Sequence, residues 1–514
     1  MKSKIHNFLK GNNSNSCKKQ TTIFRLCLIA LATLLLNTAM ANNVQCTING
    51  YSSSGTLLDI SFSWDNSWRA TQGGTEFKDG IMIFVKYKDD LNPIWRSAPI
   101  AVGNGYSSPG NGDIGDVNYK LSTHYVPLGM TAGAFDHLIV SHATTNMGNG
   151  TISGSTSLSM YIPGAVNPSF KVFALEMVNV PEGAFSVGDG KAGSTTLHEA
   201  GSNNPYTVFS NDAITLGSLP GNLDDGAGGG LIPAAFPKAY NSFWMMKYEL
   251  SQELYVAYLN CLTRAQQDAA IHPSVNLLAG TTVVPKTYVM NYGTVPAYNQ
   301  GIRCAANIPV SGEVTFYCDL SGDNVGSGID DAQNNAVRVN TPGAVLQFLD
   351  WAGMRPMSGF EYEKACRGTA TPVLNEYAWG STEAYTPTTT TTGNAAENYT
   401  PVGNGPLVTT TAVRNGAFAT ATSTRRQSGG SYYGIMELSN SLPEMNASYG
   451  TNIATSGFTT ALGDGNIANG LPATFPTSVT VQTFTSPENR VSWYSPATTP
   501  LTTVRPCAIR GVIQ

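Results

Sequence analysis

Residues 341–368, TPGAVLQFLDWAGMRPMSGFEYEKACRG, constrain the fold most, because they carry the start and stop signals of two consecutive helices. Thr341 is a good N-cap, and the proline after it fits the first helical position, where a missing N–H leaves no hydrogen bond unmade. Apolar residues recur at helical spacing up to Gly353, which suits a left-handed C-cap. Ser358 and Glu361 have the spacing of a capping box for a second helix. We therefore predict that two short helices, joined by a tight corner, form the packing centre of a domain.

The same stretch resembles the core of the formylglycine-generating-enzyme family, also called the sulfatase-modifying-factor family. Segments similar to other parts of that family follow in the family's order, and these are residues 176–189, 243–260, 375–380, 432–438 and 505–511. The resemblance implies an α+β fold related to C-type lectins, with few helices and much irregular structure. It identifies the chain as a divergent, exported bacterial member, but a fold alone does not imply an activity.

A chain of 514 residues is long enough for two or more domains. Residues 1–41 have the features of a signal peptide: a basic start, an apolar run too short to span a bilayer, and an A-x-A cleavage site at 39–41. Residues 42–168 contain short apolar runs separated by Gly, Asn and Ser turns, which predict an antiparallel, immunoglobulin-like β-sandwich. Residues 169–514 form the sulfatase-modifying-factor-like domain that the resemblance implies. The predicted fold class is therefore α+β.

Charge and hydropathy restrict the partners. The formal net charge is −5, only 12% of the residues are charged, and no block of like charge occurs. Nucleic-acid binding depends on clustered lysine and arginine, so we expect no nucleic-acid partner. No second apolar run is long enough to span a bilayer, so we expect no membrane span after signal cleavage. The expected location is the periplasm, the cell surface or the extracellular space.

Export makes disulfides plausible. Cys304 and Cys318 flank a strand–turn–strand pattern, which predicts a local bridge between them. The family resemblance implies a second bridge, between Cys366 and Cys507, that would tie the two-helix centre to the C-terminal strand. Two further cysteines have no predicted partner, Cys46 and Cys261.

The resemblance also provides a test of the enzymatic activity. The family uses two cysteines near its C-terminus to bind copper and activate oxygen, which requires thiolates. Counted back from Cys507, the corresponding positions hold Ala497 and Thr502. Neither side chain can form a thiolate, so we expect no copper and no formylglycine formation by that mechanism. The alternative is an enzyme of the same superfamily, of the formylglycine-generating or the non-haem iron type, that uses a different residue set.

Calcium is the one cofactor that the resemblance leaves open. In the family, a Gly-Asn-x-Trp-Glu pattern supports a structural calcium, and Glu444 matches its glutamate. The asparagine and tryptophan positions hold Ser441 and Pro443, which weakens the match. Asn398 and Asn415 are candidate ligands of a second site by loose alignment. The acidic segment 318–331 could also offer oxygen ligands, but its spacing is not that of an EF-hand, and a solvated turn is the favoured interpretation.

The segment that matches the family's active-site strand predicts where a ligand would bind. Trp493 and Tyr494 could contact a peptide, protein or glycan, with Arg505 and Arg510 as polar neighbours. For Trp493, packing in the core is the competing interpretation. We therefore predict an exported pseudoenzyme that serves as a non-catalytic binding or structural module for a peptide or glycan ligand.

Overall fold

The computed structural model describes part of the chain, and every structural statement below concerns that part. The described residues are 43–101, 119–124, 134–142, 146–191, 197–225, 229–277, 288–304, 308, 311–326, 328–387, 403–408, 411–420, 422–447, 457–467, 482–485, 491–492, 494–496 and 506–514. The predicted signal peptide, residues 1–41, lies outside them.

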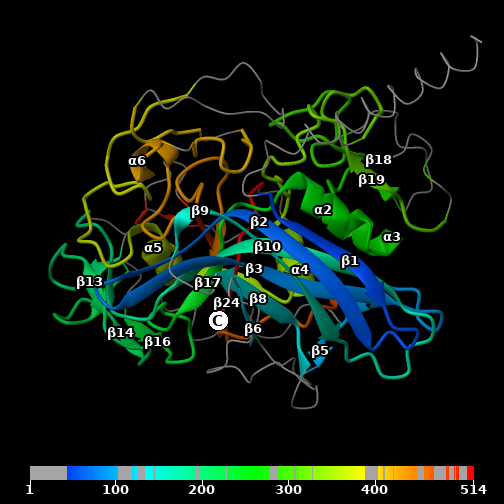
Figure 1. Ribbon diagram of the computed structural model, residues 1–514. Helices are drawn as coiled ribbons and strands as arrows, with labels where there is room; N and C mark the ends of the chain where they lie inside the picture. The colour runs from blue at the N-terminus through cyan, green and yellow to red at the C-terminus, as the bar shows by residue number, and fades with distance from the viewer. Residues whose placement is uncertain are drawn as a thin grey trace, which may run out of the picture.

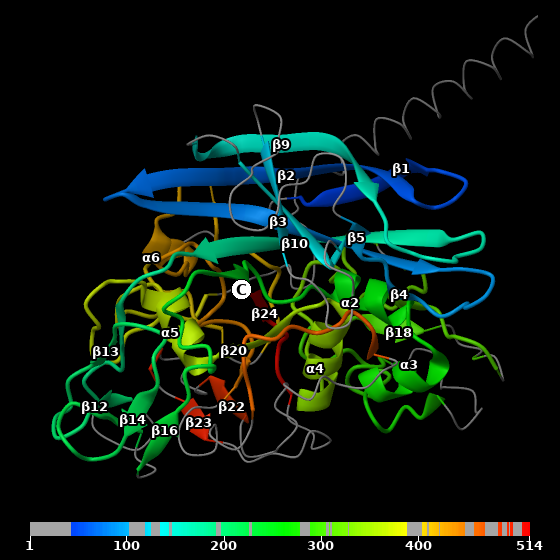
Figure 2. The ribbon, with the colours of Figure 1, turned by 90° about the horizontal axis from the view of Figure 1, so that it is seen from below.

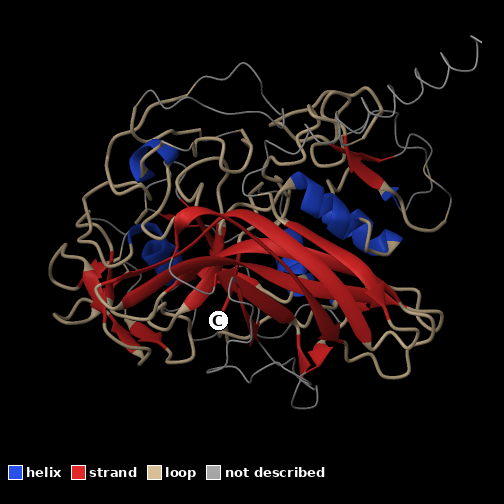
Figure 3. Cartoon of the chain, in the orientation of Figure 1, coloured by secondary structure: helices blue, strands red, loops and turns tan. Residues whose placement is uncertain are grey.

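The fold is mixed α+β, with many strands and few helices, as the sequence predicts (Figure 3). The helices are α2 (Gln252–Leu259), α3 (Arg264–Ala270), α4 (Pro342–Trp351), α5 (Gly359–Arg367) and α6 (Arg425–Ser428). The largest sheet has fourteen strands and contains β1 (Gln45–Tyr51), β2 (Leu57–Gln72), β3 (Thr75–Lys88), β4 (Arg96–Ser97), β6 (Tyr119–His124), β8 (His137–His142), β9 (Asn146–Ser159), β10 (Ser169–Val180), β17 (Phe243–Met246), β20 (Arg355–Ser358), β21 (Met445–Ala447), β22 (Gln482–Thr485), β23 (Tyr494–Pro496) and β24 (Gly511–Ile513).

Four small sheets complete the strands. They are β5 (Ile100–Ala101) with β7 (Ala134–Phe135), β11 (Phe185–Val187) with β13 (Tyr206–Val208), β18 (Ile302–Cys304) with β19 (Phe316–Cys318), and the group of β12 (His198–Glu199), β14 (Ile214–Leu216), β15 (Leu223–Asp224) and β16 (Gly230–Ile232).

The large sheet runs through both predicted domains. The predicted boundary falls between β9 and β10, yet β10 pairs antiparallel with β3, from Ser169 opposite Lys88 to Val178 opposite Asp79. On its other side β10 pairs with β17, which continues to β24 and β20. Residues 42–168 are therefore not closed off from the rest of the chain, because their central strand is hydrogen-bonded to the first strand of the second part (Figure 1).

Two layers of strands enclose the first part of the core. Strands β2 and β3 pair only near their shared turn, from Arg69 opposite Lys78 to Gln72 opposite Thr75, so the rest of β2 lies over β3. Strands β1, β2 and β9 form the outer layer in Figure 2, with β3 and β10 beneath them. Alternate residues of β2 and β3 fill the space between the layers, because successive side chains of a strand point to opposite faces.

The other face of β3 and β10 packs against helices α2 and α4. Trp351 of α4 lies at the centre of this contact, with ring centroids 5.3 Å from Phe84, 4.9 Å from Phe173 and 5.0 Å from Tyr258. The rings meet edge to face, which is a favourable geometry for aromatic pairs. This core therefore joins the N-terminal strands to the predicted two-helix centre.

The capping signals of the two-helix centre are confirmed. The Thr341 hydroxyl accepts a hydrogen bond from the Ala344 N–H, and Gly353 has a φ of 67°. Ser358 and Glu361 form the predicted capping box. The corner between the helices is β20, a strand of the large sheet, so the chain passes from α4 on one face of the sheet to α5 on the other.

Neither predicted disulfide is present. None of the six cysteines among the described residues forms a disulfide. Cys366 packs in the core on the α5 face of the sheet and Cys507 in the core on the α4 face, so β20 and β24 lie between them. Cys304 lies opposite Phe316 in the β18–β19 pair, and Cys318 lies opposite Ile302, so the register does not place the two thiols across from one another.

Residues 321–326 and 328–330 of the acidic segment 318–331 form mostly exposed turns, as the composition favours, but two of the segment's carboxylates are internal. Asp319 and Asp331 are both fully buried. Asp319 forms an ion pair with buried Arg303 and accepts hydrogen bonds from the N–H groups of Gly322 and Asn324. The carboxylate therefore organises its own loop and the neighbouring β18–β19 pair.

Candidate functional site

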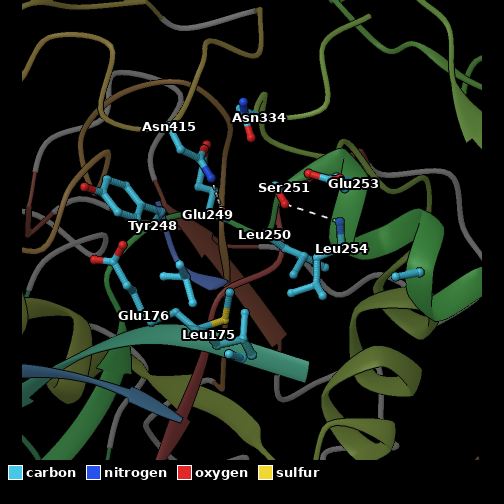
Figure 4. Close-up of a pocket in the computed structure, with 14 residues that line it drawn as sticks. Leu175, Glu176, Tyr248, Glu249, Leu250, Ser251, Glu253, Leu254, Asn334 and Asn415 are labelled. Carbon is cyan, nitrogen blue, oxygen red and sulfur yellow. Dashed lines mark hydrogen bonds between the residues drawn. The ribbon is translucent and has the colours of Figure 1, made fainter. Parts of the chain in front are cut away.

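A cavity of about 230 Å³ lies where β10, the segment after β17 and the start of α2 meet (Figure 4). We call it the α2 pocket. Its polar lining residues are Glu176, Tyr248, Glu249, Ser251, Glu253, Asn334 and Asn415. Figure 4 shows Glu176 and Tyr248 on one side, and Ser251 and Glu253 at the start of the helix on the other. The apolar part of the wall comes from Val44, Ala174, Leu175, Met246, Leu250, Leu254 and Ala257.

Backbone hydrogen bonds hold the segment that forms the pocket's back wall. The Lys247 N–H donates to the Glu176 carbonyl at 2.9 Å, which continues the β10–β17 pairing by one residue. The Leu250 N–H donates to the Ile509 carbonyl at 3.0 Å. Ser251 then caps α2, because its hydroxyl accepts the Leu254 N–H at 3.3 Å. The side chains between these anchors are therefore placed by a rigid backbone.

Glu176 is held by a buried lysine. The Lys247 ammonium lies 3.0 Å from Glu176 and 3.3 Å from Asp79, and all three side chains are largely buried. Burial alone would lower the pKa of Lys247, but the two carboxylates more than offset this and raise it. One ammonium thus faces two carboxylates, so a negative charge remains on this side of the pocket when both are ionised.

Glu249 forms the buried end of the pocket. Burial, together with the nearby Glu444 carboxylate, raises the pKa of Glu249 well above its usual value. One of its oxygens accepts the Leu442 N–H at 3.2 Å. Asn415 donates its amide N–H to the Glu249 carbonyl at 2.8 Å, while its side-chain oxygen has no hydrogen-bond partner among the described residues.

The predicted ligand residue Arg510 has a structural role instead. It is buried, its Nε lies 2.5 Å from Glu444, and its other nitrogens donate to the carbonyls of Met246 and Met436 at 2.8 Å each. A buried charge is normally paired in this way. Arg510 therefore crosslinks three segments of the core and does not line a groove.

The same ion pair bears on the predicted calcium ligands. Glu444 faces the Arg510 guanidinium, so a cation bound there would be repelled by a fixed positive charge. Asn415 lines the α2 pocket, and Asn398 lies outside the described residues. Within the part of the chain that the structure describes, no cluster of three or more His, Cys, Asp or Glu side chains could hold a metal ion. The residues present do not fit a calcium site at Glu444.

Of the residues predicted to form the ligand groove, Tyr494 and Arg510 are among the described residues. Trp493, Ala497, Thr502 and Arg505 lie outside the described residues, and Tyr494 begins β23. The α2 pocket was not predicted. Glu249 was a sequence signal for this pocket, because it places a carboxylate in the largely apolar, strand-like run before α2. Charged residues are rarely buried unless they are paired or functional.

Comparison with known proteins does not assign a family. No family model matches the chain, and no match is found among curated proteins. None of the described helices combines the length and the hydropathy needed to cross a bilayer.

Proposed function

We propose that this chain is an exported, non-catalytic binding module whose α2 pocket takes a primary ammonium group, such as a basic side chain of a peptide. The observation that carries the proposal is the lining of the pocket, which is rich in hydrogen-bond acceptors. Its lining contains three carboxyl groups and two side-chain amides, and none of its described residues is a lysine, arginine or histidine. An ammonium ion has three donors and no acceptor, so a lining rich in acceptors is complementary to it.

The size and the wall of the pocket suit a single aliphatic side chain with a charged end. A cavity of about 230 Å³ is small for a drug-sized ligand, and its wall carries Leu175, Leu250 and Leu254. These side chains can pack against the methylene groups of a lysine while the ammonium meets Glu176 and Glu253. A hydrogen bond to a charged group contributes about 1.5–3 kcal/mol, which corresponds to a change in affinity of about tenfold or more.

The fold-level part of this proposal rests on the resemblance to the sulfatase-modifying factors. A C-type-lectin-like scaffold presents irregular loops on rigid strands, which suits recognition. Export through the N-terminal segment 1–41 and an immunoglobulin-like arrangement of the first strands belong to the same proposal.

Calorimetric titration of the exported form, residues 42–514, tests the pocket. The probes are two blocked pentapeptides, one with a central lysine flanked by glycines and the other with norleucine, which lacks the ammonium. We expect the lysine peptide to bind at least tenfold more tightly. Glu253→Gln should remove about tenfold of that affinity, while Glu182→Gln, an exposed carboxylate outside the pocket, should change nothing. Equal binding of the two peptides would rule the proposal out.

The second candidate is an enzyme of the same superfamily, and one observation favours it. Burial raises the pKa of Glu437 to about 7 and also raises that of Glu444, so carboxyl groups suited to proton transfer lie behind the pocket. Metal analysis and thiol titration of the exported form distinguish the two functions. Bound copper or iron together with substrate-dependent oxygen uptake would support the enzyme, and their absence with lysine-peptide binding would support the binding module.

A further inference from the structure

A second hollow surrounds Trp95, at the opposite end of α2 from the α2 pocket. Two adjoining cavities of about 440 Å³ and about 190 Å³ share Trp95 and Leu262 in their linings. We call them together the Trp95 groove. One wall is the loop after β3, and the other is the junction of α2 and α3 around Cys261. Trp95 is half-buried and packs on the core that contains Trp351.

Two lysines lie beneath the Trp95 ring. Lys88 of β3 and Lys171 of β10 project from the same face of the sheet, because Lys171 pairs with Lys86 and residues two apart in a strand share a face. Their ammonium nitrogens lie 5.1 Å and 4.7 Å from the ring centroid. Trp95 also lines both cavities, so part of its indole faces the groove.

The charges of these lysines are not neutralised by carboxylates of the described residues. Lys171 donates to two neutral acceptors, the Asn260 carbonyl at 3.1 Å and the Cys261 sulfur at 3.4 Å. Neither Lys88 nor Lys171 forms an ion pair within the described part of the chain. The nearby Arg96 is already paired with Asp89 at 2.8 Å. The groove is thus a positive site with an aromatic platform.

The lining offers neutral hydrogen-bonding groups beside the platform. The larger cavity includes Asn92 and Gln266, together with the half-exposed ring of Tyr161. Lys88 lines the smaller cavity, where the only carboxylate among the described lining residues is the exposed Glu313. A flat aromatic face, neutral amides and an unpaired ammonium together match a sugar ring that carries a carboxylate.

We propose that the Trp95 groove binds an acidic saccharide of the uronic-acid class. The sugar ring lies on the part of the Trp95 indole that faces the groove, and the carboxylate meets Lys88 in the smaller cavity. Lys171, 4.7 Å from the ring centroid, adds positive potential. Glu313 lines the same small cavity as Lys88, so it competes with the ligand carboxylate for the Lys88 ammonium. This site is separate from the α2 pocket and does not depend on the function proposed for it.

Titration of the exported form with tetragalacturonate and with neutral cellotetraose, followed by tryptophan fluorescence and calorimetry, tests the assignment. We expect only the acidic tetrasaccharide to bind, with an affinity that falls as salt is added. Trp95→Ala should reduce the affinity at least tenfold, and Trp95→Phe should restore part of it. Lys88→Gln should weaken binding severalfold, whereas Glu313→Gln should strengthen it.

Two controls and three outcomes complete the test. Lys191→Gln, a lysine outside the groove, and Glu253→Gln, in the α2 pocket, should leave tetragalacturonate binding unchanged. The thermal transition of each variant shows whether it is folded. Equal binding of the neutral sugar overturns the proposal, as does a lack of binding by tetragalacturonate at millimolar concentration. Binding of an acidic peptide in place of the saccharide overturns it too.

Discussion

Helices α4 and α5 start from equally clear sequence signals but are buried by different means. Helix α4 presents an apolar surface, and Val345, Leu346, Phe348, Leu349 and Trp351 are all within its core. Helix α5 is just as buried, yet it carries four charged side chains that are at most 1% exposed, Glu361, Glu363, Lys364 and Arg367. The two helices lie on opposite faces of the large sheet.

Each charge of α5 has a partner, some in the helix or next to it and others in distant segments. Arg367 binds Glu363 and Glu376 at 2.7 Å each, and Glu363 also accepts the Gly188 N–H at 2.7 Å. The Lys364 ammonium donates to the carbonyls of Pro181 and Ala239 at 2.6 Å and 2.7 Å. A helix with charged side chains can therefore be buried as completely as an apolar helix, provided that each charge has a partner. The loss of one partner then leaves an unpaired charge in the interior.

The largest effect should come from Arg367→Met. The substitution leaves Glu363 and Glu376 buried without their shared cation, and breaking a buried pair in this way costs about 3–5 kcal/mol. Urea unfolding at pH 7 measures the loss. The loss should shrink as the pH falls towards 4, because the abandoned carboxylates can then take up protons. A loss that does not change with pH would show that Arg367 acts through packing alone.

Trp351→Ala is the matching change on α4, with an expected cost of about 3–5 kcal/mol from the cavity that it leaves. The ring contacts four other aromatic residues, so its neighbours have little freedom to fill the space. In contrast to Arg367→Met, this loss should be the same at pH 5 and pH 7. Trp351→Phe is the control and should lose clearly less. Similar pH dependence in both variants would remove the distinction between the helices.

Asp350 is the one charged residue of the largely apolar helix α4, and its substitution should have a smaller, pH-dependent effect on stability. Burial raises the pKa of Asp350 to about 7, and that of Asp136 across the interface also to about 7, both above the unfolded value of about 3.9. A raised carboxyl pKa contributes stability that is complete below pH 4 and is lost as the pH rises through 7.

Asp350→Asn should therefore stabilise the protein at pH 8, by on the order of 2 kcal/mol, and flatten the decline between pH 4 and 7. Asparagine keeps the oxygen that accepts the Asp464 N–H, so the loop contact survives. Lys86 lies close to Asp350 and Asp136, and burial lowers its pKa to about 8. Its contribution to the stability of the fold is therefore present above its unfolded pKa and is lost as the pH falls through 8. Thermal unfolding from pH 4 to 8 checks the sign, and a less stable variant at pH 8 would contradict it.

The smallest effects concern the caps, where the two helices should behave alike. Thr341→Ala and Ser358→Ala each remove a side-chain cap and should each cost about 1 kcal/mol in urea unfolding. Thr341→Ser and Ser358→Thr keep the hydroxyl and serve as controls. A much larger loss for Ser358→Ala would mean that its hydrogen bond to the Pro237 carbonyl, at 2.7 Å, matters more than the cap.

The sequence predicted the local features of this fold well and the long-range ones poorly. Caps and helix ends depend on a few neighbouring residues, so Thr341, Gly353 and Ser358 could be interpreted correctly. The predictions of the two disulfides were wrong because spacing along the sequence does not show distance in space. Cys366 and Cys507, for example, lie on opposite faces of one sheet. Both hollows escaped detection, since the α2 pocket combines Glu176, Glu249 and Asn415 from separate parts of the chain.

The sequence by itself therefore determined where the two central helices begin and end, and that the fold is α+β. Only the tertiary structure decided that β20 carries the chain through the sheet, that β10 joins the two predicted domains, and which charges are paired inside. The physical reason is the range of the interactions. Capping hydrogen bonds close within one helical turn. The hydrogen bonds that join Glu363 and Lys364 to distant segments, like the walls of both hollows, form only when those segments come together in the folded chain.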